Sequence, residues 1–439
     1  MNNLRLLTGL LAAALLGNGT DVYAQTERVI TIEDLFDSAE NRSAQLRPSF
    51  SAEEEARHEI SVARSGRLPD VTANLSLSYL GDGFTTDRGF GDYQVAPIPH
   101  LGNGLGIDIS QPIYTGGAVT AAIRMAELKS DAARLSTDLN RDNLRFKLAT
   151  MYLDLYKYRN LRLVVTNNIS QARKLLDEMT ARYNQGIALR NDITRYELLV
   201  SDLEFRLIRI DNTLDILNRN LVVTAGLPDN LTIIPDTTML SRSLPKESET
   251  WWQGEAGRHS PSLLLGVSDV EINRKAESLA KSELLPKVGL YAGWTIDGPI
   301  LVEVPPINRN LSYWYIGVGI KYNISSLFKS NKSLSKSRAA TIVASDRLDA
   351  LSENLRLEIR ADYLRYLEAY DELVTREKSV ELAERNYHTT FTRYSADMAL
   401  ITDMLDAANS KLDAEQQLVN ARINIIYYYY KLLYTSGTI

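Results

Sequence analysis

The segment Arg182–Asp192, RYNQGIALRND, occurs a second time in the chain as RYSADMALITD at residues 393–403. Both copies begin with Arg-Tyr and end with Asp. Each is followed by a long polar and apolar stretch that ends at a glycine, Gly226 in the first copy and Gly437 in the second. The offset between matching residues is 211. A duplication of this length indicates one structural unit that occurs twice and packs against its own copy.

The chain begins with the pattern of a secretory signal peptide. Arg5 precedes an apolar run at residues 6–16, and Val22-Tyr23-Ala24 is a small-residue cleavage site. The apolar run is too short to cross a bilayer as a helix, which takes about 20 residues. We therefore expect residues 1–24 to be removed and the mature protein to be exported.

The composition excludes several classes of protein. The chain contains no cysteine, which rules out disulfides and a cysteine-linked lipid anchor. A net charge of −6 argues against nucleic acid as a partner. Four scattered histidines give no metal-binding pattern, and the sequence has no nucleophile elbow, phosphate loop or pair of catalytic carboxylates. We therefore expect no enzymatic activity, no cofactor and no metal site.

Four segments alternate apolar with small or polar residues, which is the spacing of a β-strand with two different faces. They are residues 71–79, 104–110, 288–296 and 314–322, and aromatic residues lie near their ends. This pattern is typical of membrane-spanning strands in an outer-membrane barrel. A soluble β-sandwich with one buried face is the alternative. The signal peptide and the presence of only two such hairpins favour the barrel.

Four strands cannot close a membrane barrel. Each unpaired backbone group at a lipid-exposed edge costs several kcal/mol, and the smallest bacterial barrels have about eight strands. The chain must therefore share a barrel with its own copies, two giving about eight strands and three about twelve. An eight-stranded barrel is filled by its own side chains, so the inward-facing glycines and serines favour three copies around an open lumen.

Long stretches without glycine or proline predict unusually long helices. Residues 118–184 form one of them, and at a rise of 1.5 Å per residue this helix would extend about 100 Å. The chain turns near residues 186–191 and again near 396–402. The returning helices are expected to end at Gly226 and Gly437, because glycine tolerates the left-handed conformation that caps a helix.

The remaining elements of the two copies follow the same order. A single helix is expected before each strand pair, over residues 31–67 and 249–285, and a proline follows each of them. Residues 81–103 and 297–312 are rich in Gly, Asp and Pro and are expected to be exposed loops.

The chain therefore divides into four parts. Residues 1–24 are the signal peptide, and residues 25–227 are a first repeat of helix, β-hairpin and long helical hairpin. Residues 228–248 are a linker, expected to form an irregular belt around the middle of the helices. Residues 249–439 are the second repeat.

This duplicated order resembles the TolC-like outer-membrane efflux family, the outer membrane factors. The resemblance covers residues 31–437. The motifs that carry it are Leu68-Pro69 and Leu285-Pro286 before the strands, PIYTGG at 112–117, and the two tip segments from Tyr183 and Tyr394. The resemblance implies an α+β membrane protein with internal duplication. It would be a trimeric 12-stranded β-barrel, four strands per chain, continued by a long α-helical coiled-coil tunnel through the periplasm.

The resemblance also implies the function. The chain would be the outer-membrane exit duct of a tripartite efflux system, passing small molecules, drugs or metal ions from an inner-membrane pump to the outside. The implied partners are two further copies of the chain in a homotrimer, a periplasmic adaptor protein, an inner-membrane RND or ABC transporter, and outer-membrane lipid. A type I protein-secretion duct is the alternative within this class. A periplasmic coiled-coil scaffold without a pore is the alternative outside it.

Asp403 and Asp406 are the candidate pore constriction. They are three residues apart and so share one helix face. If this face lines a tunnel, three copies bring six carboxylates to one opening, and rings of Asp or Glu select cations. The resemblance places constriction aspartates at these positions. The alternative is a pair of solvated aspartates near a helix N-terminus, where the helix dipole favours them.

The candidate gating contacts lie at the same tips. The resemblance implies that Asp192 holds the closed state by a hydrogen bond to the neighbouring hairpin, with Tyr394 as the donor. Some relatives carry a basic residue at the second tip, where this chain has Ala399-Leu400. We therefore expect Arg190 or Arg393 to take the place of that base.

Overall fold

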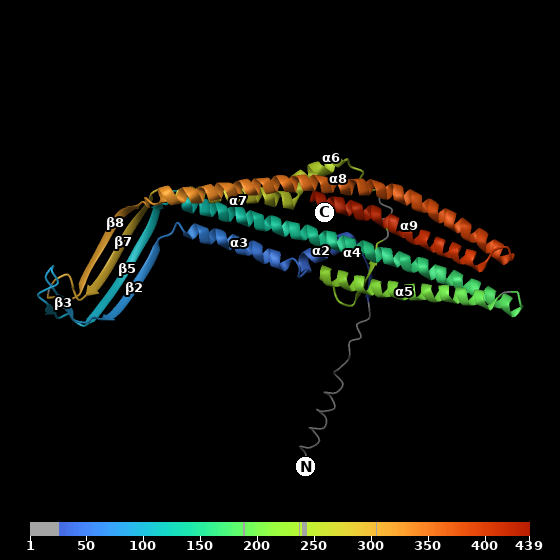
Figure 1. The fold of residues 1–439 in the computed structure, drawn as a ribbon, viewed down its shortest axis with the longest axis horizontal. Coiled ribbons are helices and arrows are strands. Elements are labelled where there is room, and N and C mark those ends of the chain that lie inside the picture. Colours follow the sequence, from blue (N-terminus) through green and yellow to red (C-terminus); the bar gives the residue numbers. More distant parts are fainter. Residues whose placement is uncertain (1–25, 188, 237, 239–243, 304) are drawn as a thin grey trace, which may run out of the picture. The chain divides into compact units, whose positions relative to one another are not determined.

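The computed structural model describes residues 26–187, 189–236, 238, 244–303 and 305–439, and Figure 1 traces the order of the elements. The expected signal peptide, residues 1–24, lies outside the described residues. The chain divides into two compact units, each built from separate stretches of sequence. Unit 1 comprises Met1–Arg47, Asn140–Arg258 and Leu357–Ile439, and unit 2 comprises Pro48–Leu139 and His259–Arg356.

In unit 2, four of the described strands form one antiparallel sheet in the order β2-β5-β7-β8. They are β2 (Asp70–Tyr79), β5 (Leu101–Tyr114), β7 (Lys287–Gly298) and β8 (Leu311–Lys321). These strands confirm the four alternating segments of the sequence, extended by a few residues at some ends. Their apolar face is open to the surroundings, and Leu75 and Trp314 are 83% and 74% exposed. The alternation therefore produces an apolar surface rather than a packed core.

The predicted exposed loop between β2 and β5 contains a short hairpin. Its strands are β3 (Gly83–Thr85) and β4 (Gln94–Ala96), and the rings of Phe84 and Tyr93 stack with centroids 5.0 Å apart. The expected loop at residues 81–103 is therefore partly a β-structure, and its last residues already belong to β5.

Four long helices form the two helical hairpins. α4 (Ala118–Asn184) has the predicted bounds and is followed by α5 (Arg190–Ala225), and α8 (Ser326–Ser395) is followed by α9 (Ile401–Ser436). The caps Gly226 and Gly437 have φ angles of 67° and 72°, which confirms their predicted left-handed conformation. Within the described ranges, no helix combines the length and the apolar character that crossing a membrane requires.

The two helices predicted before the strand pairs are each broken in two, so the prediction of single helices is wrong. Residues 31–67 form α2 (Ile32–Arg42) and α3 (Arg47–Ser65), and residues 249–285 form α6 (Glu249–His259) and α7 (Pro261–Ser282). Proline is favoured in the first turn of a helix and disfavours helical geometry in the residue before it. Pro261 therefore ends α6 and starts α7.

The segment expected to be an irregular linker contains a strand. β6 (Leu231–Pro235) pairs in parallel with β1 (Thr26–Ile30) in unit 1. Tyr152 fixes this pair, since its hydroxyl donates to the Ile30 carbonyl at 2.8 Å and accepts from the Asp236 amide at 2.7 Å. Burial raises the pKa of Tyr152 to about 12, so the phenol stays protonated and keeps both hydrogen bonds.

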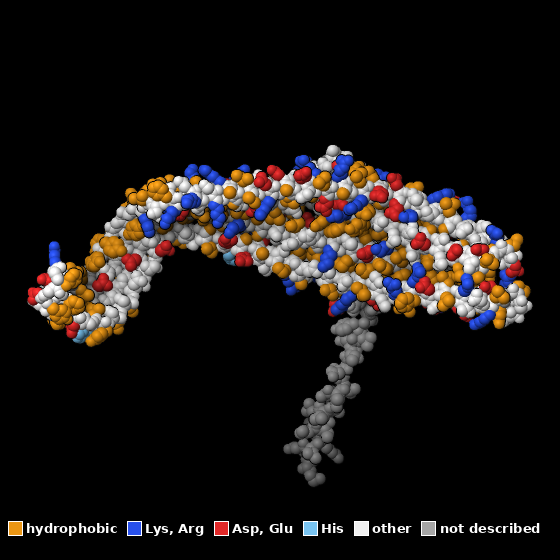
Figure 2. Space-filling view, in the orientation of Figure 1, with side chains coloured by type: hydrophobic (Ala, Val, Ile, Leu, Met, Phe, Trp, Pro, Cys, Tyr) orange, Lys and Arg blue, Asp and Glu red, His pale blue; other side chains and the backbone are white. Residues whose placement is uncertain are grey.

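The core of unit 1 consists of apolar side chains between the hairpins. The run of four tyrosines at 427–430 packs on several sides of α9. The rings of Tyr430 and Phe36 pack edge to face, and so do those of Tyr429 and Trp252, which is buried in α6. Figure 2 shows charged side chains spread among apolar ones over the visible face of the helices.

Candidate functional site

The turns of the two hairpins have the same unusual backbone. Gly186 joins α4 to α5 with a φ of 77°, and Asp397 joins α8 to α9 with a φ of 58°. These two residues are 211 positions apart, so they occupy the same place in the two copies. A positive φ is uncommon for residues other than glycine, although Asp and Asn accept it more readily than most. The second turn therefore carries a carboxylate at the apex where the first has no side chain.

This carboxylate joins the two hairpins. Nη2 of Arg182, at the end of α4, lies 2.5 Å from Oδ1 of Asp397. The same guanidinium lies over the ring of Tyr394, 5.8 Å from its centroid. An isolated surface ion pair contributes only about 0–1 kcal/mol to stability. The Arg182 side chain, however, is three-quarters buried and lies over the Tyr394 ring. Its guanidinium is therefore held in one orientation toward Asp397.

Asp192 and Tyr394, the predicted gating pair, lie near enough for the charge of Asp192 to act on the Tyr394 hydroxyl, and the hydrogen bond between them stays a prediction. Tyr394 belongs to the core at the hairpin tips, where it is 9% exposed. Burial raises the pKa of Tyr394, and the nearby negative charge of Asp192 raises it further, while the charge of Arg182 opposes the rise. Tyr394 therefore stays protonated, and the charges of Asp192 from one hairpin and Asp397 from the other both act on it.

The other two predicted gating residues contact their own hairpins. Nη2 of Arg190 lies 3.8 Å from Oε1 of Glu197 on the same helix. Nη2 of Arg393 donates to the carbonyl of Met398 at 3.4 Å, across the turn of its own hairpin.

Asp403 and Asp406 are both exposed on the first turns of α9. Ile401 and Met404 are buried in the tip core, so the two aspartates point away from it on the opposite side of the helix. Oδ2 of Asp403 also accepts a hydrogen bond from the backbone amide of Leu400 at 3.0 Å, which caps the start of α9. Among the described residues no cluster of three His, Cys, Asp or Glu side chains could hold a metal ion.

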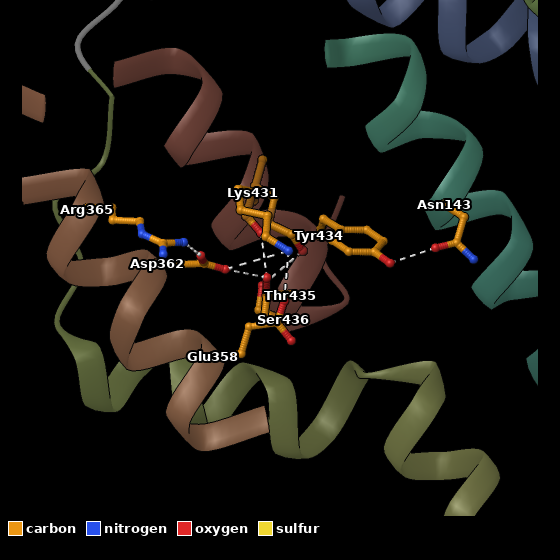
Figure 3. A network of polar contacts seen from close by, with 9 residues as sticks. Asn143, Glu358, Asp362, Arg365, Lys431, Tyr434, Thr435 and Ser436 are labelled. Atoms are coloured by element: carbon orange, nitrogen blue, oxygen red, sulfur yellow. Dashed lines mark hydrogen bonds and ion pairs between the residues drawn. The ribbon is translucent and has the colours of Figure 1, made fainter. Parts of the chain in front are cut away.

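A buried polar network lies farther from the tips, between α8 and the end of α9 (Figure 3). Asp362 is 1% exposed and accepts a hydrogen bond from the Thr435 hydroxyl at 2.8 Å. Two cations flank it, with Lys431 Nζ at 3.9 Å and Arg365 Nη1 at 3.7 Å, and Lys431 also reaches Glu358 at 2.8 Å. The network ties the C-terminal turn of α9 to α8.

The charges in this network shift one another's pKa values. Burial raises the pKa of Asp362, and the Thr435 hydrogen bond and Lys431 only partly offset this. Burial lowers the pKa of Lys431, but its hydrogen bond to Glu358 and the charge of Asp362 outweigh this, so the net direction is upward. Lys431 is therefore firmly protonated and compensates a carboxylate that has little access to water.

Sequence reasoning missed both Arg182 and the buried network. The sequence did offer one signal for the Arg182 contact. Asp397 stands at a turn where the first copy has Gly186, and a charged residue at such a position indicates a partner of opposite charge. The network gave no local signal, since Asp362 and Thr435 are 73 residues apart and neither belongs to a motif.

A four-stranded sheet with an open apolar face and two long helical hairpins are the features that define the class of this protein. The chain belongs to the outer membrane efflux protein family, whose model matches residues 35–225 and 252–426. It is therefore an outer-membrane efflux protein that extends into the periplasm, and not an enzyme.

Curated relatives match over nearly the whole chain. The outer membrane efflux protein BepC of Brucella suis is 21% identical over 98% of this chain and 90% of the relative. The outer membrane protein TolC of Vibrio cholerae is 22% identical over 99% of this chain and 96% of the relative. The solved structure of the outer membrane protein VceC of Vibrio cholerae has the same fold. It superposes with a TM-score of 0.75 at 17% identity and covers 92% of this chain and 96% of that one.

Proposed function

We propose that this protein is the exit duct of a tripartite efflux system and that it works as a homotrimer. Three copies would complete a 12-stranded barrel and continue it as a helical tunnel. A periplasmic adaptor and an inner-membrane RND or ABC transporter would deliver small molecules, drugs or metal ions. The proposed division of the mature chain is two repeats, 25–227 and 249–439, with a connecting segment at 228–248.

The observation that carries this proposal is a pair of exposed apolar stripes, one on α5 and one on α8. Successive members are three, seven or eight residues apart on α5 and seven, eight or ten residues apart on α8, so each stripe stays near one side of its helix, as in a coiled-coil seam. Every member is at least 49% exposed in the single chain: Leu198, Phe205, Ile208 and Ile216 on α5, and Leu357, Leu364, Val374 and Leu382 on α8. Large exposed apolar stripes on helices mark interaction surfaces.

The two stripes also fit each other. α5 runs away from its turn and α8 runs toward its turn, so the two helices would meet antiparallel between neighbouring copies. Counted from the turns, the members of the two stripes interleave in the order Leu198, Leu382, Phe205, Ile208, Val374 and Ile216. An interface between two different faces of the same chain generates a ring when the rotation closes. The stripes therefore support a cyclic assembly.

The sheet supports the same assembly. Within the described sheet, β2 and β8 are the outer strands. In lipid, backbone groups at such edges must be paired, and β8 of one copy with β2 of the next would do this. Three copies give about twelve strands, with the apolar face toward lipid and the glycine-rich polar face toward an open lumen.

Pore formation tests the proposal directly. Purified protein added to planar lipid bilayers is expected to produce stepwise increases in conductance, and chemical cross-linking is expected to give a trimer. Stable trimers without conductance, or protein that stays in the soluble fraction, would overturn the duct.

We further propose that the Arg182–Asp397 contact holds the two hairpins together in the closed state. Arg182→Gln and Asp397→Gly are each expected to raise the open probability in single-channel recordings, because either change removes the charged link between the hairpins. Glycine is chosen because it keeps the positive φ of the turn, as Gly186 does in the first copy. The double variant is expected to open no more than the singles do, since all three lack the same contact.

The matched control is an equally short ion pair inside one hairpin. Nη2 of Arg173 on α4 lies 2.5 Å from Oε1 of Glu204 on α5, and both side chains are exposed. Arg173→Gln is expected to leave the open probability unchanged. Equal effects of Arg173→Gln and Arg182→Gln would show that net charge, rather than the link between hairpins, controls opening.

A further inference from the structure

One row of residues crosses the polar face of the sheet in unit 2. Thr72 on β2 pairs with Asp108 on β5, Asp108 with Gly293 on β7, and Gly293 with Tyr315 on β8. Residues that pair directly in an antiparallel sheet project from the same face. Asp108 and Tyr315 therefore share a face but are separated by a whole strand, at the position of Gly293.

The Tyr315 side chain crosses that strand. Its hydroxyl donates a hydrogen bond to Oδ1 of Asp108 at 2.9 Å. A Cβ atom on Gly293 would lie 2.6 Å from both Cε1 and Cζ of the ring. Carbon atoms pack at about 3.5–4.0 Å, so no side chain is compatible with this position of the ring. The glycine is what allows Tyr315 to lie flat along the sheet.

A second tyrosine on the same face is placed in the same way. A Cβ atom on Gly319 would lie 2.7 Å from Cε2 of Tyr291. Gly317 is different, since a Cβ atom there would meet no described atom within 4 Å. Gly293 and Gly319 are thus required by the rings above them, whereas Gly317 on the same face is not.

We propose that Gly293 sets the free width of the channel. Because it has no side chain, the Tyr315 ring can lie flat against the channel wall, where its hydrogen bond to Asp108 holds it. This inference rests on the proposed barrel, in which the polar face lines the lumen. A side chain at position 293 displaces the ring, and the open direction on that face is toward the lumen. In a trimer the displaced rings project into one cross-section of the path that cargo follows.

The absence of native cysteine allows a specific test. Positions are counted inward from the loop that carries β3 and β4. Ser76→Cys places a thiol before the row that contains Tyr315, and Ser110→Cys places a thiol one row beyond it. Intact cells are treated from outside with membrane-impermeant maleimides of graded size. Gly293→Val is expected to slow labelling of the Ser110→Cys reporter several-fold for the larger maleimides and to leave the Ser76→Cys reporter unchanged.

Two further variants identify the ring as the cause. Gly317→Val adds the same side chain at the open position and is expected to slow labelling much less. Tyr315→Ala in the Gly293→Val background is expected to restore the rate, because the displaced ring is gone. Labelling at the unaltered rate in assembled Gly293→Val trimers, or no restoration in the double variant, overturns the proposal.

Tyr315→Phe keeps the test decisive if Gly293→Val does not assemble. It retains the ring and Gly293 but removes the hydroxyl that donates to Asp108. Labelling of the Ser110→Cys reporter is expected to slow less than with Gly293→Val. An unchanged labelling rate would show that the hydrogen bond to Asp108 does not hold the ring in place. Failure of the proposed barrel has a different signature. In that case neither reporter is labelled from outside in an otherwise unaltered chain.

Discussion

Replacing Asp403 and Asp406 together by asparagine is expected to weaken block of the channel by multivalent cations by about tenfold or more, or about 1.4 kcal/mol of binding free energy. Both carboxylates are exposed and share the face of α9 opposite the buried Met404. In the proposed trimer they form a ring at one opening, where carboxylates concentrate cations. The measurement is single-channel current in planar bilayers with hexaamminecobalt added at the periplasmic side.

Asparagine is the appropriate replacement because Asp403 also stabilises the start of α9. Its Oδ2 accepts the Leu400 amide at 3.0 Å and caps α9. Alanine would remove this cap at a cost of about 1 kcal/mol, and a disordered tip could change conductance by itself. The amide oxygen of asparagine keeps the acceptor and removes only the charge.

The control removes one exposed charge from the other hairpin. Asp202 on α5 pairs with Arg206 at 2.8 Å, and Asp202→Asn is expected to leave cation block unchanged. If the Asp403→Asn, Asp406→Asn channel is blocked as strongly as the unaltered one, the two aspartates are solvated surface residues and the carboxylate ring is rejected.

The long hairpins could be predicted because their signals are local. No glycine or proline interrupts residues 118–185, and α4 runs without a break as far as Asn184. Gly226 and Gly437 cap the returning helices with the left-handed conformation that few other residues tolerate. The strands were predictable for the same reason, since period-two alternation depends only on neighbouring residues.

The breaks in the shorter helices were missed although both have a local signal. Apolar spacing continues across the turn between α2 and α3, where Ser43 and Leu46 are buried. Pro48, however, lies in the first turn of α3, where proline favours a new helix. Pro261 does the same at the start of α7, and the sequence prediction gave both prolines too little weight.

Contacts at the tips depend on which faces of the hairpins meet. A duplication shows that two hairpins are alike, but it does not show which helix of one lies against which helix of the other. Arg182 and Asp397 are 215 residues apart and come from different hairpins. The divergence of Asp397 from Gly186 marked one half of this contact, and only the fold identifies the other half.

The second large effect is expected in the buried network of Figure 3, where Lys431→Met should destabilise the protein by about 2 kcal/mol at neutral pH. Methionine keeps the apolar part of the lysine side chain but removes the positive charge of Lys431, which lies 3.9 Å from the buried Asp362 carboxylate. Removing one member of a fully buried pair costs about 3–5 kcal/mol. The expected loss is smaller because Lys431 keeps 20% of its side-chain surface exposed and Arg365 still lies 3.7 Å from Asp362.

The loss should depend on pH in a defined direction. Burial raises the pKa of Asp362, so the folded state binds its proton more tightly than the unfolded state does. The stability that this group provides is therefore fully present below the ordinary aspartate pKa, about 3.9, and is lost as the pH rises through the raised value. Lys431→Met raises that value further. Its cost relative to the unaltered protein should be largest near neutral pH and should shrink toward about pH 4.

Urea titrations of detergent-solubilised protein, followed by circular dichroism, measure this cost, and two variants show whether its cause is electrostatic. Asp362→Asn in the Lys431→Met background is expected to recover most of the loss, since the amide is neutral and still accepts from Thr435.

Lys378→Met breaks an exposed pair with Glu381 at 2.7 Å and is expected to cost less than about 1 kcal/mol. A Lys431→Met loss that is independent of pH and persists in the double variant would instead mean that lysine contributes through its packing against Phe146 and Tyr434. The buried charge of Asp362 would then be compensated by Thr435 and Arg365 alone.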